Sequence, residues 1–312
     1  MIDIINFGSI NLDYVYSVEH FVKDGETITA QARNVFFGGK GLNQSIAAAR
    51  AGGRVFHAGM IGDGGESIVQ YLAESGVETR YIGHANAAQG HAVIQVDSSG
   101  RNSIIVFPGS NHELSQAYVD GVLSQFPDGG YLILQNEISC VEYIVDQAHA
   151  AGFHVVFNAS PIDSSLTRIP IDKLSWLMIN ETEGAALSGS HEPRKMIGIL
   201  HERYPQVSIV LTLGGDGVMC INKGIFSSFG IYDTEVVDTT AAGDTFTGYF
   251  VACLAAGCSL SDTIKMATAA SAIAISYPGA SPSIPNRETV HAMIVSGDVS
   301  YMERVQKSCR KH

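Results

Sequence analysis

A run of small residues between two carboxylates is the part of this sequence best suited to chemistry. Residues 238–248 read Asp-Thr-Thr-Ala-Ala-Gly-Asp-Thr-Phe-Thr-Gly and open a segment typical of a helix. Small residues let a ligand approach the backbone, and a helix start favours an anion such as phosphate. Asp244 would repel that phosphate unless it has a task, such as taking a proton from an attacking hydroxyl. Taken alone, the stretch is equally compatible with Asp238 or Thr240 capping the helix and Asp244 complementing its dipole.

A second helix start with glycines lies at residues 38–45, which read Gly-Gly-Lys-Gly-Leu-Asn-Gln-Ser. Glycines here would again bring a ligand close to the backbone, while Lys40 and Asn43 offer hydrogen-bond donors to hydroxyl groups. The stretch is not a P-loop, because the glycine spacing differs and Gly41 follows the lysine. It is not G-x-G-x-x-G either, so a nicotinamide-dependent oxidoreductase receives little support.

Polar residues follow most of the apolar runs that we predict to be buried strands. These runs are residues 2–8, 131–135, 154–158, 176–179 and 207–213. A parallel sheet brings the carboxyl ends of its strands to one edge, where α/β proteins bind ligands. Turns alone would not explain so many polar clusters, so we predict an active site at this edge. The clusters are Asn11 with Asp13, Glu137, Asn180 with Glu183, Thr212 with its glycines, and residues 238–244.

Two stretches interrupt the alternation of strands and helices. Residues 14–18 and 27–32 resemble short strands, as do residues 91–96 and 103–107. We expect one domain over residues 1–312, a doubly wound α/β fold with a large, mostly parallel sheet flanked by helices. The interruptions, at about residues 12–37 and 90–108, would form a small β-sheet that acts as a lid or a dimerisation surface. Helices are predicted at residues 46–51, 66–75, 141–151, 242–256 and 262–276, and from residue 287 onward.

Composition excludes several classes of protein. The 312 residues carry a formal net charge of −12, which argues against a nucleic-acid binder. No apolar run is long enough for a membrane span, and the first residues lack the basic flank of a signal peptide. The cysteines form no C-x-x-C pair, so neither a disulfide framework nor a zinc site is indicated. We therefore expect a soluble, cytoplasmic protein; its cysteines are Cys140, Cys220, Cys253, Cys258 and Cys309.

Taken together, the motifs resemble the ribokinase/pfkB family of carbohydrate kinases, and within it the ribokinase branch. The resemblance runs from the first strand through Ser283 and rests on five motifs in the family's order and spacing. They are Asn11-x-Asp13, residues 38–44 (Gly-Gly-Lys-Gly-Leu-Asn-Gln), residues 108–111 (Pro-Gly-Ser-Asn), residues 180–183 (Asn-Glu-Thr-Glu) and residues 238–246.

The resemblance implies an ATP-dependent kinase that phosphorylates a primary hydroxyl of a pentose, in the first place D-ribose to ribose 5-phosphate. Asp244 would be the base, and the N–H groups of Ala241, Ala242 and Gly243 would hold the charge on the transferring phosphoryl group. The sugar would be bound by Asn11, Asp13, Gly39, Lys40, Asn43, Glu137 and Asp244. The nucleotide would be bound by Asn180, Thr212, Gly214, Gly217, Ala242 and Gly243.

The resemblance also implies two ions. Mg²⁺ would be arranged by Asn180 and Glu183 through water, because this ion keeps several of its waters. A monovalent cation such as K⁺ would lie beside the anion hole. The matching positions for the monovalent cation are Asp238, Thr240, Ala274, Tyr277, Gly279 and Ser283. A homodimer through the small sheet is expected as well, since an exposed sheet has edges and an apolar face to cover.

Two alternatives remain open from the sequence. A kinase for another sugar or for a nucleoside could use the same fold, because Gln89-Gly90 stands where Thr-Gly is familiar near the sugar. A non-catalytic sugar-binding sensor belongs to a different class. The presence of both Gly243 and Asp244 argues against the sensor.

Overall fold

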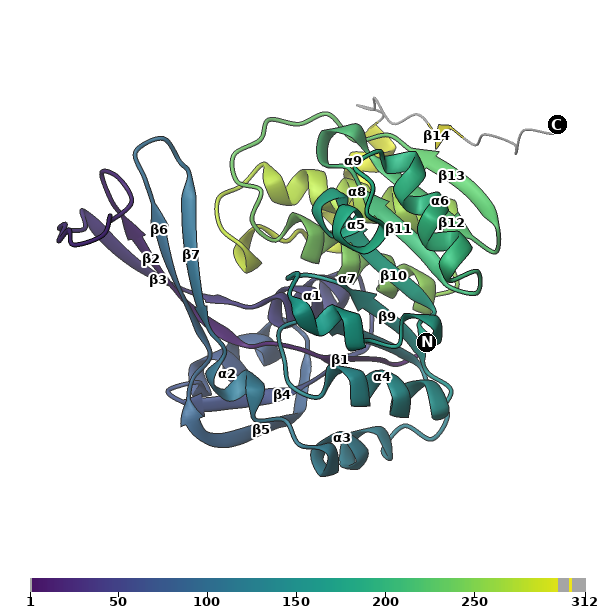
Figure 1. Cartoon of the computed structure of the whole chain (residues 1–312), viewed down its shortest axis with the longest axis horizontal. Helices are drawn as coiled ribbons and strands as arrows, with labels where there is room; N and C mark the ends of the chain where they lie inside the picture. The colour runs from purple at the N-terminus through teal and green to yellow at the C-terminus, as the bar shows by residue number, and fades with distance from the viewer. Residues whose placement is uncertain (1, 297–302, 305–312) are drawn as a thin grey trace.

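A large sheet forms the centre of the molecule, and the computed structural model describes residues 2–296 and 303–304 (Figure 1). Its strand order is β5-β4-β1-β8-β9-β10-β11-β12-β13-β14. The strands from β5 to β11 pair in parallel, and the last three are antiparallel. The bounds are β1 Ile4–Phe7, β4 Val55–Asp63, β5 Glu78–Ala88, β8 Tyr131–Gln135, β9 His154–Asn158, β10 Trp176–Asn180, β11 Ser208–Thr212, β12 Val218–Asn222, β13 Ile225–Phe229 and β14 Glu303–Arg304.

Helices cover the large sheet on both faces. Alternate residues of one strand enter different cores, since Ile4 of β1 packs in one apolar cluster and Ile5 in the other. This alternation is the period of two that a strand buried on both faces requires. The predicted doubly wound fold is therefore confirmed. The helices are α1 Lys40–Arg50, α2 Glu66–Glu74, α3 Gln116–Leu123, α4 Val141–Ala150, α5 Glu181–Ser188, α6 Pro193–Arg203, α7 Ala242–Ala255, α8 Leu260–Ile275 and α9 Arg287–Ser296.

The small sheet is separate and projects from the body of the molecule (Figure 1). Its order is β3-β2-β6-β7, with β2 at Asn11–Ser17, β3 at Ala32–Gly38, β6 at His91–Val96 and β7 at Asn102–Phe107. The expectation of a strand at residues 27–32 is wrong. Strand β2 ends at Ser17, which pairs with Ala32, so earlier residues have no partner strand along β2. The strand begins at Ala32 and runs through the aromatic pair to Gly38 instead.

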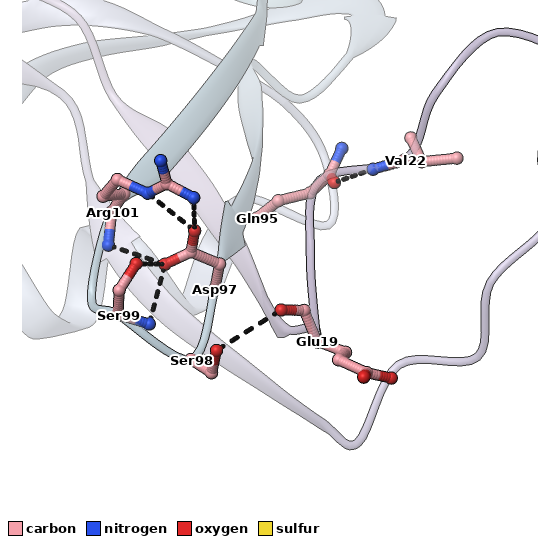
Figure 2. Close-up of polar contacts among 7 residues, drawn as sticks. All are labelled: Glu19, Val22, Gln95, Asp97, Ser98, Ser99 and Arg101. Carbon is pink, nitrogen blue, oxygen red and sulfur yellow. Dashed lines mark hydrogen bonds and ion pairs between the residues drawn. The ribbon is translucent and has the colours of Figure 1, made fainter.

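The tip of the small sheet is a turn organised by one carboxylate (Figure 2). Asp97 accepts hydrogen bonds from the backbone N–H groups of Ser99 and Arg101 and from the Arg101 guanidinium. Hydrogen bonding to Ser99, which outweighs the cost of burial, and to Arg101 lowers the pKa of Asp97 to about 2. The neighbouring loop is tied to this hairpin, because Val22 N–H donates to Gln95 and Ser98 donates to the Glu19 carbonyl.

Several elements carry too weak a signal to be predicted. Strand β5 lies at one edge of the large sheet, and its sequence Glu-Thr-Arg-Tyr-Ile-Gly-His-Ala-Asn-Ala-Ala is largely polar or small. The β12–β13 hairpin turns through Lys223 and Gly224, both at positive φ, and a lysine there is no turn signal.

Among the described residues no helix is both long and apolar enough to span a bilayer. Cys309 lies outside the described residues.

Candidate active site

The glycines at the start of α1 are required by packing against the turn after β1. A Cβ added at Gly41 would lie 2.3 Å from the Ser9 nitrogen and 2.4 Å from the Gly8 backbone. Gly39, the residue before the helix, has φ 96° and would place a Cβ 2.9 Å from the Ser9 carbonyl oxygen. A Cβ at Gly38 would meet the Asp13 carboxylate. The loop therefore presses the start of α1 onto the end of β1.

Asp244 lies where the starts of α1 and α7 meet. Its side chain is 7% exposed, and each carboxylate oxygen accepts one hydrogen bond from α1. Asn43 Nδ2 donates to Oδ2 at 3.0 Å, and Gln44 Nε2 donates to Oδ1 at 2.9 Å. The structure thus brings Asp244 and Asn43 together, 201 positions apart in the chain. The role of Gln44 was not predicted from the sequence.

The side chains expected to bind the sugar are held with free polar groups. Asn111 Nδ2 donates to Asn11 Oδ1 at 2.7 Å, which leaves the Asn11 amide protons available. Asn43 Oδ1 is buried and has no hydrogen-bond partner among the described residues. Such an orphaned oxygen indicates a ligand donor, because an unpaired buried acceptor is costly.

Asp13 and Glu137 supply carboxylates beside these amides. Burial, helped by the charge of Glu137 and opposed by Lys40, raises the pKa of Asp13 to about 6. Burial also raises the pKa of Glu137, against Lys40 and a hydrogen bond from Ser9. Glu137 Oε2 accepts from Ser9 Oγ at 2.5 Å and from the Lys40 N–H at 3.1 Å. The structure therefore uses one oxygen of Glu137 to fix the loop, a role for Ser9 that the sequence did not indicate.

Lys40 lines a cavity of about 220 Å³ with Asp244 and the start of α7. Burial would lower the pKa of Lys40, but nearby carboxylates outweigh it and raise that pKa. The lysine therefore stays positively charged beside Asp244, where it could bind an anionic ligand. The carboxylates belong to Asp244, Glu137, Glu183 and Asp13.

The start of α7 presents its backbone to the same cavity. Ala241, the residue before the helix, has φ 60° and ψ 10°, a left-handed conformation that is strained for alanine. Its N–H and that of Gly243 have no partner in the part of the chain that the structure describes, while the Ala242 N–H makes a long bond of 3.3 Å to Thr239. A Cβ added at Gly243 would meet no atom of the described residues within 4 Å beyond its chain neighbours and the backbone of its own helix. Packing within the protein therefore does not require glycine at position 243, and the space beside it is available to a ligand.

A second cavity of about 320 Å³ adjoins the first and shares Thr212, Ala242 and Gly243 with it. Gly214 and Gly217, two of the residues expected at the nucleotide, also line the second cavity. A Cβ at Gly217 would lie 2.1 Å from the Phe229 carbonyl, so this glycine is needed for packing, whereas Gly214 faces open space.

Asn180 and Glu183 form a capping box at the start of α5. Asn180 Oδ1 accepts from the Glu183 N–H at 3.0 Å, and Glu183 Oε2 accepts from the Asn180 N–H at 2.7 Å. Both residues also line the cavity beside Lys40. No group of three or more His, Cys, Asp or Glu side chains that could hold a metal exists among the described residues. A divalent ion here would therefore depend on ligands that the substrate brings.

Of the residues expected at a monovalent cation, Thr240 and Gly279 bond directly to Asp238. Its Oδ1 accepts from the Thr240 N–H at 2.9 Å and from the Thr240 hydroxyl at 2.6 Å, and its Oδ2 accepts from the Gly279 N–H at 2.9 Å. Burial opposes the charge of Asp238, but these hydrogen bonds outweigh it and lower its pKa. Ala274 accepts from the Tyr277 N–H, and the Ser283 hydroxyl donates to Ala280. A carboxylate bound only by these neutral donors retains charge for a cation.

The comparison with known proteins follows this geometry. The pattern of the pfkB family carbohydrate kinases matches residues 1–287, so the chain belongs to this family. It is 36% identical over 295 residues to a ribokinase of Haemophilus influenzae, with 90% of this chain and 94% of that protein covered.

Two solved structures extend the likeness. The ribokinase of Cryptococcus neoformans var. grubii in complex with ADP matches with a TM-score of 0.82 and 34% identity, covering 94% of this chain and 99% of that chain. The Arabidopsis thaliana ribokinase complexed with ribose and ATP matches with a TM-score of 0.82 and 28% identity, covering 94% and 98%. The predicted family and fold are thereby confirmed.

Proposed function

We propose that this chain transfers the γ-phosphate of ATP to the primary hydroxyl of D-ribose and releases ribose 5-phosphate and ADP. The observation that carries the proposal is the position of Asp244. Its carboxylate bonds to Asn43, whose free oxygen indicates a sugar ligand, and it lines the cavity that the start of α7 shares with the nucleotide pocket. The base thus lies between the two substrates.

In this reaction Asp244 accepts the proton of the hydroxyl as that oxygen bonds to the γ-phosphorus, and the bond from phosphorus to the ADP oxygen breaks. The N–H groups of Ala241, Ala242 and Gly243 at the start of α7 would stabilise the charge that develops on the phosphoryl oxygens. Lys40 adds a fixed positive charge on the other side of the same cavity.

The choice of ribose rests on the relatives and on the polar set at the sugar site. Asn11 keeps its amide N–H groups and Asn43 keeps its amide oxygen for a ligand, and Asp13 is a buried carboxylate, so several hydroxyls can be matched at once. Gln89 does not belong to this set. Its amide bonds the Gly62 N–H and the Ile10 carbonyl, so it braces the backbone and its replacement of threonine does not itself redirect sugar specificity.

Mg²⁺ fits the site only as a partner of ATP. Two buried carboxylates, Asp244 and Glu183, line the phosphate cavity, and because Asp244 acts as the base, Glu183 is left for the ion. Mg²⁺ commonly binds through one or two carboxylates, substrate phosphates and water. Asn180 and Glu183 would hold its waters, and the ion would neutralise phosphate charge. K⁺ would bind at the corner of Asp238, Thr240, Ala274, Tyr277, Gly279 and Ser283. Residues 277–283 would link this ion to the start of α7.

We further infer one domain whose small sheet acts as a lid over the sugar and joins two copies into a homodimer. Strand β7 exposes a continuous apolar run, with Ile104 51%, Ile105 64%, Val106 54% and Phe107 47% exposed. Such a patch favours burial against a partner. ATP as substrate and the free cysteines of the described chain support the cytoplasm as its location. Sedimentation of the wild type as a dimer and of Ile105→Glu as a monomer would test the interface.

The test of function is ADP release from ATP and Mg²⁺ with ribose, other sugars and nucleosides, with and without K⁺. We expect turnover on ribose, an increase with K⁺ and dependence on Mg²⁺. Turnover on a different substrate would retain the mechanism and overturn the substrate. Sugar binding without turnover on any substrate would overturn the kinase proposal.

A further inference from the structure

A chain of buried side-chain hydrogen bonds lies beneath the proposed base and leads away from both substrates. It begins at Gln44, whose Nε2 donates to Asp244 and whose Oε1 accepts from Gln135 Nε2 at 2.8 Å. Gln135 Nε2 also donates to Asn6 Oδ1 at 2.8 Å. The side chains that make up this polar chain are all 0% exposed: Asn6, Gln44, Ser45, His57 and Gln135.

The far end of the polar chain is anchored on backbone. Asn6 Nδ2 donates to the Gly41 carbonyl at 2.7 Å and to Ser45 Oγ at 2.9 Å. Ser45 Oγ lies 2.8 Å from His57 Nδ1, and His57 Nε2 lies 3.2 Å from the Gly8 carbonyl oxygen. The polar chain thus joins strands β1, β4 and β8 to the first turns of α1.

The direction of every bond in this polar chain follows from its anchored end. Burial lowers the pKa of His57 to about 4, so the ring is neutral and carries one proton. The Gly8 carbonyl can only accept, which places that proton on Nε2 and leaves Nδ1 to accept from the Ser45 hydroxyl. Ser45 then accepts from Asn6, so Asn6 must turn its oxygen to Gln135.

The same logic fixes the amide nearest the base. Gln135 uses its nitrogen for both Asn6 and Gln44, so Gln44 must present its oxygen to Gln135 and its N–H to Asp244. A flipped Gln44 amide would place an oxygen against the carboxylate and two N–H groups against each other. Carboxamides do not release protons at neutral pH, so the polar chain orients and does not conduct protons.

The polar chain also lowers the stability of the folded protein. Gln135 Oε1 is buried and has no hydrogen-bond partner among the described residues, and an unsatisfied buried acceptor destabilises the folded state. Apolar side chains of similar shape would avoid that cost. The arrangement therefore contributes something other than stability. What it touches at its open end is Asp244.

We infer that Gln44 is the positioning residue of the base and that Gln135, Asn6, Ser45 and His57 hold Gln44 in register. With Oδ1 accepting from Gln44 and Oδ2 from Asn43, the plane of the carboxylate is fixed, and the lone pairs that these two bonds leave unused are available to the sugar hydroxyl. Rotation of the carboxylate would lengthen the proton transfer, and small misplacements of a reacting group cost up to about 100-fold in rate. This inference rests on the proposed kinase function.

The test compares Gln44→Met and Gln135→Met, which keep side-chain length and remove the amides. We expect kcat to fall about 10–100-fold in Gln44→Met and less in Gln135→Met, with the KM values for ribose and ATP unchanged, because neither residue contacts a substrate. The matched control is Thr263→Val on α8, which removes another fully buried hydroxyl that has no partner in the described part of the chain, and it should retain wild-type kcat.

The decisive measurement is a double-mutant cycle with Asp244→Asn. If Gln44 acts through the base, adding Gln44→Met to Asp244→Asn leaves the residual rate unchanged. A full additional loss in the double variant, or a raised KM for ribose with wild-type kcat, would overturn the inference. If Gln135→Met does not fold, Ser45→Ala interrupts the same polar chain further from the base. Absence of turnover in the wild type would instead contradict the proposed function.

Discussion

Two helices begin at the active site, and each is preceded by a residue at positive φ and has a glycine as its second residue. Gly39 precedes α1 with φ 96°, and Ala241 precedes α7 with φ 60°. The start of α1 is closely packed against the turn after β1, since a Cβ at Gly41 would collide with the Gly8 and Ser9 backbone. The start of α7 is open, since outside its own helix backbone and chain neighbours a Cβ at Gly243 meets no atom of the described chain within 4 Å.

The difference shows two distinct uses of glycine. At α1, close packing directs side chains, and Asn43 and Gln44 reach Asp244 from a helix that cannot shift. At α7, the helix offers its backbone N–H groups, and space is reserved for phosphate. The start of α1 positions the base through packed side chains. The start of α7 leaves space for the phosphoryl group, whose charge its N–H groups would stabilise.

Asp244 is where both starts meet, so its replacement has the largest expected effect. Asp244→Asn keeps the shape but cannot accept a proton, and its amide nitrogen would face Asn43 or Gln44. We expect kcat for ribose to fall about 10³-fold, within the usual range for a general base. Calorimetry should still detect ribose binding to the variant. A variant with more than a tenth of wild-type kcat would remove Asp244 from the mechanism.

Gly41→Ala tests the packed start. The added methyl group would lie 2.3–2.4 Å from backbone atoms that cannot rotate away. We expect the free energy of unfolding to drop by about 3 kcal/mol or more, the upper end for overpacking. Thermal and urea unfolding measure this loss. An unfolding midpoint like that of the wild type would show that β1 and α1 can separate without cost.

Gly243→Ala tests the open start and should behave in the opposite way. Alanine favours a helix over glycine by up to about 1 kcal/mol, so the midpoint of unfolding should stay or rise. Because the methyl group enters the space shared by both cavities, kcat/KM for ATP should fall about 100-fold. Loss of stability with normal ATP use would contradict the assignment of this space to the nucleotide.

Much of the fold could be predicted because buried strands are distinctive. Residues 131–135, 154–158 and 176–180 are apolar runs rich in branched side chains, and the structure has strands there. Strand β5 was missed because an edge strand needs few apolar residues. The strand expected at residues 27–32 was wrong because pairing with β2, not composition, sets where β3 begins.

The site divides in a similar way. Asn43 and Asp244 belong to motifs that indicate the chemistry of these residues. Asn6 and Gln135 belong to no such motif and are polar residues within apolar strands. That interruption was the available signal, since a polar side chain inside a buried strand needs a partner. The partner itself lies on other elements, such as Ser45 and Gln44, and only the packed structure identifies it.

Asp13, beside the start of α1, should make both the stability and the ribose affinity of the protein depend on pH. The folded pKa of Asp13 is about 6, above its ordinary value of 3.8, so the ionised folded form is penalised as pH rises through this range. Asp13→Asn should therefore raise the unfolding midpoint relative to wild type above pH 6 and change it little near pH 4. Calorimetric ribose affinity of the wild type should fall about tenfold between pH 7 and pH 5 as the carboxylate is protonated. A flat profile would contradict a role for ionised Asp13.

The smallest effect is expected at Ala241. The residue at positive φ before α7 is this alanine, whereas before α1 it is Gly39. Left-handed alanine costs about 1 kcal/mol, and glycine would remove that strain but loosen the unfolded chain. Ala241→Gly should thus leave the free energy of unfolding within about 0.5 kcal/mol of wild type or raise it slightly. We expect kcat to fall a few-fold, because N–H groups that are fixed before the reaction stabilise developing charge better than mobile ones. Gly39→Ala is the matched control, since its Cβ would lie 2.9 Å from the Ser9 carbonyl and should reduce stability. An Ala241→Gly variant with unchanged kcat would mean that the strained alanine contributes nothing to holding the anion hole.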